Sequence, residues 1–208
     1  MQNTRTRRIR IALAVLASGA ALALAAVPAT AAAGAGPDGP PRFLEPADMP
    51  PHPTSDWYAG AVTAGQPDPL PICVGEALPS ISSHRAYWTE YDTNALQVTV
   101  VERDEQRAAA LAALLRKKLA DCAGTLMRQD PDITAEGKYY GKLFVEEGAH
   151  VYGVHTSSSW GSSDIGLFSV GRDGRTVTVV KWAQLGTFQH AQVADFRVTT
   201  ATAVNKLY

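Results

Sequence analysis

Hydrophobic and polar residues alternate along six short segments of the chain, which is the pattern of β-strands with one buried face. In residues 96–101, for example, Leu96, Val98 and Val100 share one face. Turn residues separate neighbouring segments, and Asp173-Gly174 is a strong signal for a hairpin. The predicted strands are residues 85–91, 96–101, 139–147, 149–156, 165–170 and 175–183.

Two further segments carry apolar residues every three or four positions, as an amphipathic helix does. The first covers residues 105–123, with Asp104 as the N-cap and Gly124 as the stop. Its basic residues at 116–118 lie near the C-terminal end, where they suit the helix dipole. The second covers residues 190–206.

Each predicted helix follows a predicted hairpin, and the strand Gln97–Val101 resembles the strand Thr176–Val180. This order suggests an internal hairpin–helix duplication. Hairpins joined by short turns favour an antiparallel sheet over a parallel, doubly wound one. We therefore predict an α+β fold with an antiparallel sheet of about six strands and two main helices on one face.

The first 31 residues (1–31) have the three-part layout of a secretory signal peptide. Four arginines precede an apolar run, residues 11–27, and Ala29-Thr30-Ala31 offers small residues to a signal peptidase. Because an apolar run of 17 residues is short for a bilayer span, we expect cleavage and no membrane span in the mature chain. No cysteine lies nearby, which excludes a lipoprotein. The protein is expected to be secreted, by the general route or, given Arg7-Arg8, by the twin-arginine route.

Residues 32–42 are mostly small or turn-forming and predict a flexible tether. The domain follows at residues 43–208. Its first part, residues 43–79, is rich in proline, which prevents a long helix, and we interpret it as an extended arm laid across the domain. The expected apolar anchors of the arm are Phe43, Trp57, Leu70 and Ile72.

The chain has two cysteines, Cys73 in the arm and Cys122 on the buried stripe of the first predicted helix. In an exported protein two cysteines usually pair with each other. A redox or catalytic role lacks support, because the sequence has no CxxC motif and no basic group beside a cysteine at a helix N-terminus. We therefore predict a structural disulfide that pins the arm to the helix.

Charge and motif content argue against several functions. Removing residues 1–31 leaves 15 basic against 20 acidic residues, a balance unsuited to nucleic acid. The five histidines show no metal-ligand spacing, so we expect no metal and no cofactor. The GxSxG motif is absent, and a serine hydrolase would have to use the serine-rich loop 157–163 with His155 and Asp164. We expect no enzymatic activity.

Aromatic residues on or beside the predicted strands are the candidates for ligand binding, because ligand pockets are rich in aromatic side chains. Trp160 is the first choice, since it lies in a polar loop with no apolar pattern to bury it. The other candidates are His155, Trp88 and Trp182. Packing in the core is the alternative use of these aromatic residues.

Several features together resemble the PknH-like extracellular sensor domain. They are the export signal, the proline-rich lead to Cys73, the strand Ala95–Val101, and a helix with Ala108, Leu111, Leu115 and Leu119 that ends in Asp121-Cys122. The resemblance covers about residues 43–208. That domain is found outside the membrane on mycobacterial serine/threonine kinases and in standalone exported actinobacterial proteins.

The resemblance implies a sensor or binding domain with an antiparallel sheet, helices and a cleft. The kinase member has two disulfides, whereas this chain has cysteines for one and no kinase domain, so signalling would need a partner. Our leading hypothesis is a secreted, non-enzymatic domain that binds a small molecule or a cell-envelope component in a groove between the sheet and residues 157–163. The alternatives are a protein-interaction module that docks on an envelope protein through its acidic surface, and a serine hydrolase.

Overall fold

The structure, a computed structural model, describes residues 39–208. The predicted signal peptide (1–31) and most of the predicted tether (32–42) lie outside the described residues. Within residues 39–208, no helix is both long and apolar enough to cross a lipid bilayer.

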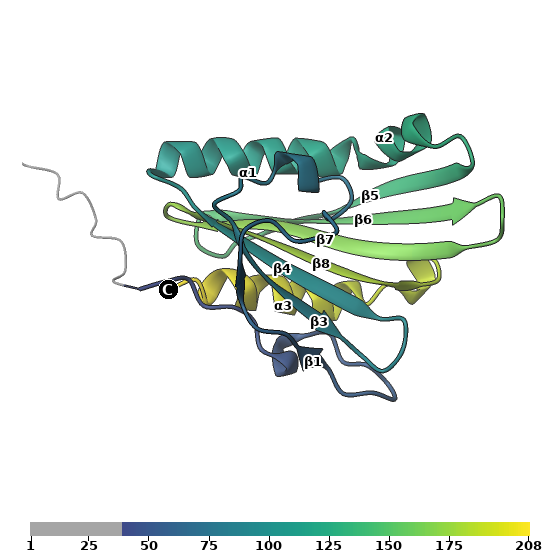
Figure 1. Cartoon of the computed structure of the whole chain (residues 1–208), viewed down its shortest axis with the longest axis horizontal. Helices are drawn as coiled ribbons and strands as arrows, with labels where there is room; N and C mark the ends of the chain where they lie inside the picture. The colour runs from purple at the N-terminus through teal and green to yellow at the C-terminus, as the bar shows by residue number, and fades with distance from the viewer. Residues whose placement is uncertain (1–38) are drawn as a thin grey trace, which may run out of the picture. The chain divides into compact units, whose positions relative to one another are not determined.

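One antiparallel sheet of eight strands organises the described chain (Figure 1). The strands are β1 (Tyr58–Ala59), β2 (Thr63–Ala64), β3 (Ser83–Trp88), β4 (Asn94–Val101), β5 (Ile133–Leu143), β6 (Gly148–Ser158), β7 (Ser163–Asp173) and β8 (Thr176–Leu185). Their order across the sheet is β1-β3-β4-β8-β7-β6-β5, and β2 also pairs with β3. The predicted α+β class and antiparallel sheet are confirmed. The six predicted strands correspond to β3 to β8, and the two short additional strands come from the proline-rich arm.

Local turn chemistry fixes the register of the β7–β8 hairpin. Asp173 pairs with Thr176, which leaves Gly174 and Arg175 as a two-residue turn. Gly174 has a φ of 51°, a left-handed conformation that glycine adopts without strain. The hairpin predicted from the Asp-Gly pair is therefore confirmed.

Two helical segments follow β4. Helix α1 (Glu105–Ala120) begins after Asp104, whose side chain accepts a hydrogen bond from the Arg107 amide at 2.8 Å, as predicted for an N-cap. The chain then bends and continues as α2 (Cys122–Gln129), so the prediction that Gly124 ends the helix is wrong. Glycine inside a helix costs only about 1 kcal/mol relative to alanine, and the packing of α2 on β5 offsets this cost.

The helices lie on opposite faces of the sheet, which corrects the prediction that both cover one face (Figure 1). The buried stripe of α1 packs on one face, against Val98 and Val179. The third helix, α3 (Val193–Asn205), packs Phe196 on the other face, against Val180. The neighbouring residues Val179 and Val180 of β8 point to opposite faces of the sheet, and both are apolar. Both faces of the sheet must therefore be covered.

The predicted hairpin–helix duplication fails at the helices. The two matching strands, β4 and β8, lie side by side, and their equivalent residues Val98 and Val177 face the same side of the sheet. The helix that follows β4 covers this side, whereas the helix that follows β8 covers the opposite side. The two hairpin–helix units therefore cannot be superposed.

The proline-rich arm packs on both faces of the sheet. Leu44 is buried with the α3-side core, and Val74 is buried with the α1-side core. Of the expected anchors, Phe43 is buried and Trp57 is partly buried against the α3-side core, whereas Leu70 and Ile72 are more than 40% exposed. Phe43 and Trp57 therefore hold the arm as expected, and the buried residues Leu44 and Val74 replace the other two anchors.

Buried hydrogen bonds fix the start of the arm. The side-chain oxygen of Gln97, fully buried in β4, accepts from the Leu44 amide at 2.7 Å. The Tyr87 hydroxyl donates to the Leu44 carbonyl at 2.8 Å, and the Gln97 amide nitrogen donates to Thr178 at 3.2 Å. Both backbone polar groups of Leu44 are therefore paired where water is excluded, as a buried segment requires.

The predicted disulfide between Cys73 and Cys122 is present, with Cα atoms 5.3 Å apart. Cys122 is fully buried at the start of α2, and Cys73 packs against the same α1-side core. The bond therefore ties the arm to the junction of α1 and α2.

We expect the Cys73→Ala/Cys122→Ala double variant to have a free energy of unfolding about 4 kcal/mol below that of the oxidised wild type. The reason is that the bond joins residues with a sequence separation of 49 and so constrains the unfolded chain. Urea denaturation measures the difference, and reduced wild-type protein is the matched control. Equal stability of oxidised and reduced protein would contradict this role of the bond.

Candidate functional site

A cavity of about 650 Å³ lies between one flank of α1 and the outer strands β5 and β6. We call this cavity the α1 groove. Its lining includes Ala113 and Arg116 of α1, Gly137 and Tyr139 of β5, and His150 and Tyr152 of β6.

Small side chains leave this space open. Ala113 and Ala120 lie on the flank of α1 that faces the groove, and Gly137 of β5 adds no side chain. The apolar stripe of α1 lies on an adjacent flank and packs on the sheet, so α1 is held in place while its small-residue flank stays uncovered. Leu119 and Tyr152, both largely buried, add apolar surface to the groove.

Three polar side chains form a hydrogen-bonded chain along the groove. The Arg116 guanidinium lies 2.8 Å from Nε2 of His150, and the Tyr139 hydroxyl lies 2.8 Å from Nδ1. Because a guanidinium can only donate, Nε2 accepts, and the proton of the neutral imidazole is on Nδ1. His150 therefore donates to the Tyr139 oxygen, which leaves the Tyr139 hydroxyl proton for another acceptor.

The surroundings keep His150 neutral. Partial burial lowers the pKa of His150 below its ordinary value of 6.5, and the positive charges of Arg116 and Lys142 lower it further. The neutral ring is the form that accepts the hydrogen bond from Arg116. Protonation would remove this bond and place two positive charges side by side, so the position of Arg116 is linked to pH.

Arg116 is the cation that the groove presents to a ligand. Lys117 also lines the groove, but its ammonium is 2.9 Å from the carboxylate of Asp121. Lys138 directs its ammonium over the ring of Tyr140, which packs against the α3-side core. Among residues 39–208 no carboxylate forms an ion pair with Arg116.

The four residues predicted to bind a ligand are not brought together in this groove. Trp182 is only 1% exposed and packs in the α3-side core. Trp88 lies on β3, where it is 45% exposed and stacks on Tyr58. His155 lies on β6, and Trp160 is 66% exposed at the turn between β6 and β7. The α1 groove is lined by other residues.

The serine-rich loop offers part of the predicted hydrolase triad. Nε2 of His155 lies 2.9 Å from the Ser163 hydroxyl. Asp164 follows Ser163 along β7, so its side chain points to the opposite face of the sheet. There burial lowers the pKa of Lys181, and the charge of Asp164 partly opposes this shift. Asp164 is therefore not placed to orient His155, and the predicted combination does not form a triad.

Arg116, His150 and Tyr139 were missed as a group by reasoning from the sequence. The helix dipole is enough to explain a basic residue at position 116, so Arg116 gives no signal of a site. His150 is 34 residues away along the chain, so the sequence does not show that the two side chains meet. The available signal was the pair of alanines, Ala113 and Ala120, that flank Arg116 on one side of the helix.

Comparison of the chain with family models, with curated proteins and with solved structures gives no match. The resemblance to the PknH-like sensor domain therefore stays a prediction from the sequence pattern. In the part of the chain that the structure describes, no three His, Cys, Asp or Glu side chains form a group suited to a metal ion.

We expect acidification to destabilise the fold in part through His150. The unfolded chain takes up a proton at the ordinary pKa of 6.5, whereas the folded pKa is lower. Between these two values the unfolded state binds more protons, so stability falls as the pH drops through this window. In His150→Gln the amide oxygen can still accept from Arg116 but does not titrate.

Thermal melts of both proteins between about pH 7.5 and about pH 5 measure the effect. The His150→Gln variant should lose less stability than the wild type over this range. An equal loss in the two proteins would show that His150 is not held neutral by the fold.

Proposed function

We propose that the chain is an exported binding domain that captures a small, partly apolar molecule in the α1 groove. The observation that carries this proposal is Arg116, a half-buried cation held against neutral His150 in the wall of a largely apolar cavity. The cavity volume of about 650 Å³ lies within the range of about 300–1,000 Å³ that is usual for small-molecule sites.

The groove is built from elements that the rest of the fold holds in place. Helix α1 is fixed to the sheet by its apolar stripe, and the Cys73–Cys122 bond ties the arm to the start of α2, next to the end of α1. On the opposite wall the rings of Tyr139 and Tyr152 lie 5.0 Å apart and offer aromatic surface. A groove formed in advance avoids the entropic cost of ordering its walls when a ligand binds.

Two further observations support a place outside the cell and a binding role. The disulfide is compatible with an extracellular protein, and the N-terminal residues 1–31 have the layout of an export signal. The resemblance to the PknH-like sensor domain supports a cleft that holds a ligand. Capture of a ligand outside the cell needs no signalling partner. We therefore propose that the domain captures its ligand and does not transform it.

A neutral apolar dye, N-phenyl-1-naphthylamine, tests the groove because its fluorescence rises in apolar surroundings. We expect saturable binding to the oxidised protein, and Ala113→Trp should weaken it by about tenfold or more by filling the groove. The matched control is Ala110→Trp, since Ala110 is also exposed on α1 but does not line the groove. Its affinity should stay within about twofold of wild type.

Two results would contradict the proposed function. One is a wild-type protein that does not bind the dye at all. The other is an Ala113→Trp variant that binds the dye as tightly as Ala110→Trp does, since the dye would then lie elsewhere.

A further inference from the structure

Arg116 and His150 line a second, smaller cavity of about 170 Å³ beside the α1 groove. This second cavity also contains Lys142 of β5, Arg172 of β7 and Glu147 of the β5–β6 turn. The Arg116–His150 pair therefore stands between two spaces of different character. One has mainly apolar walls, and the other is bordered by charged side chains.

The acidic residue of the second cavity is already engaged. One carboxylate oxygen of Glu147 accepts from the Gly174 amide at 2.9 Å, and the other lies 4.0 Å from the Arg172 guanidinium. Glu147 and Arg172 thus hold the β7–β8 turn against the β5–β6 turn and largely neutralise each other.

Arg116 and Lys142 remain as the net positive charge. Lys142 lies over the ring of Phe144, with 5.5 Å from its ammonium to the ring centroid, and Phe144 is itself 94% exposed. Within residues 39–208 neither Arg116 nor Lys142 forms an ion pair with a carboxylate. Arg116, Lys142 and His150 line the same cavity, and both cations lower the pKa of His150 in addition to its burial. A positive site of this kind stands out in a chain whose residues after position 31 are acidic in balance.

We propose that the ligand of the α1 groove is an anionic amphiphile, with one acidic head group at Arg116 and Lys142 and an apolar body in the groove. This inference rests on the proposed function. A guanidinium has five N–H donors, and the contact with His150 uses the donor on one terminal nitrogen, so Arg116 can also hold a carboxylate, sulfonate or phosphate. The neutral His150 ring orients the guanidinium toward such a head group.

The number of cations indicates how many anionic groups the ligand carries. Arg116 and Lys142, which have no carboxylate partner among residues 39–208, both line the cavity beside the apolar groove and match a single anionic group. A nucleic acid would require a longer basic stripe to follow its phosphates. The small volume of the second cavity agrees with a head group of a few atoms.

A pair of dyes that differ by one charge tests this inference. The anionic dye 8-anilinonaphthalene-1-sulfonate is N-phenyl-1-naphthylamine with one added sulfonate. We expect Arg116→Gln to weaken binding of the anionic dye by about tenfold or more, and Lys142→Gln by about threefold. Each substitution should weaken binding of the neutral dye by a smaller factor, because that dye has no charge for the two cations to hold.

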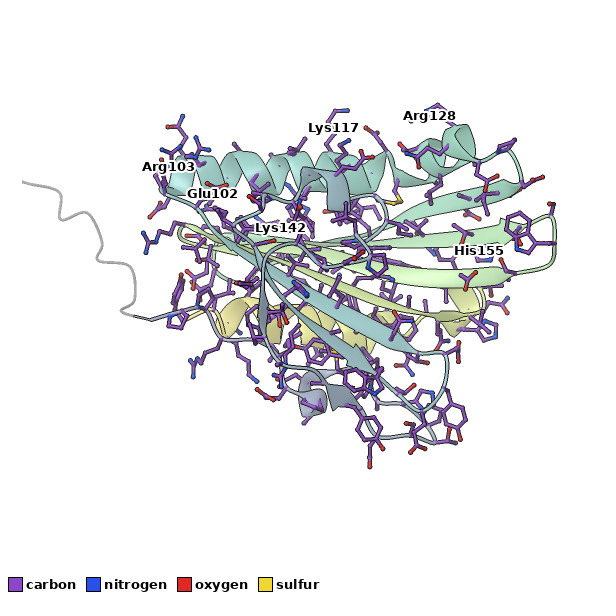
Figure 2. All side chains as sticks on the ribbon, viewed as in Figure 1. Glu102, Arg103, Lys117, Arg128, Lys142 and His155 are labelled. Atoms are coloured by element: carbon purple, nitrogen blue, oxygen red, sulfur yellow. A yellow bond between two sulfur atoms is a disulfide. The ribbon has the colours of Figure 1, made fainter. Side chains whose placement is uncertain are left out.

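Arg103→Gln is the matched control, because it removes the same charge just before the N-terminus of α1, away from Lys142 (Figure 2). It should leave the affinities for both dyes unchanged. Lys142→Gln provides a second test on another element if Arg116→Gln disturbs folding, which circular dichroism would reveal.

Displacement of the bound anionic dye identifies the head group. Decanoate or decyl phosphate should displace the dye at much lower concentration than uncharged decanol does. If decanol is equally effective, or if the two substitutions weaken both dyes equally, the inference of an anionic ligand is wrong while the groove itself stands. Failure of the neutral dye to respond to Ala113→Trp would instead remove the proposed function.

Discussion

The central strands are apolar on both faces, and the rest of the fold follows from the need to cover both. In β8, Val179 and Val180 are adjacent, fully buried, and belong to two different cores. Because both faces are apolar, α1 covers one and α3 covers the other. One α-helix covers only part of a sheet face, and the proline-rich arm packs beside each helix to cover more of it. Prolines cannot donate hydrogen bonds to a sheet, and the two arm strands, β1 and β2, are short. Buried side chains, the Gln97 contacts and the disulfide hold the arm as well.

The candidate site lies at the edge of the sheet area that α1 covers. The apolar stripe of α1 is centred over the sheet, and the flank that reaches toward β5 and β6 carries alanines instead of larger apolar residues. The outer strands therefore keep an uncovered strip, bordered by Tyr139 and Tyr152. Arg116 at this border has no carboxylate partner in the described chain, so the same gap that exposes apolar surface also exposes a charge.

Local periodicity predicts the six long strands and the two long helices, but not β1, β2, α2 or the layers of the fold. The three-or-four spacing of Ala108, Leu111 and Leu115 identified α1, and the Asp-Gly pair at 173–174 identified the β7–β8 turn. The central strands are apolar on both faces, so the sequence of a strand does not indicate the face on which a given helix packs. The periodicity of a helix therefore does not say which face it covers, and neither does the repeated hairpin–helix order that suggests a duplication.

The site could not be predicted because its parts are distant in sequence. A tryptophan in a strand pattern can be a core residue or a pocket residue, and burial in the structure shows Trp182 to be the former. The groove needs Ala113 on a helix and Gly137 on a strand to meet with nothing between them. Only the pairing of α1 with β5 and β6 brings Arg116 to His150.

The most direct test of the account is to map ligand contacts by nuclear magnetic resonance. A titration of 15N-labelled mature protein with 8-anilinonaphthalene-1-sulfonate would follow the backbone amide signals. The account predicts that the shifted signals gather on residues 113–120 of α1, 137–139 of β5 and 150–152 of β6. Shifts gathered instead on the Ser157–Ser163 turn around Trp160 would contradict it and favour the loop as the binding site.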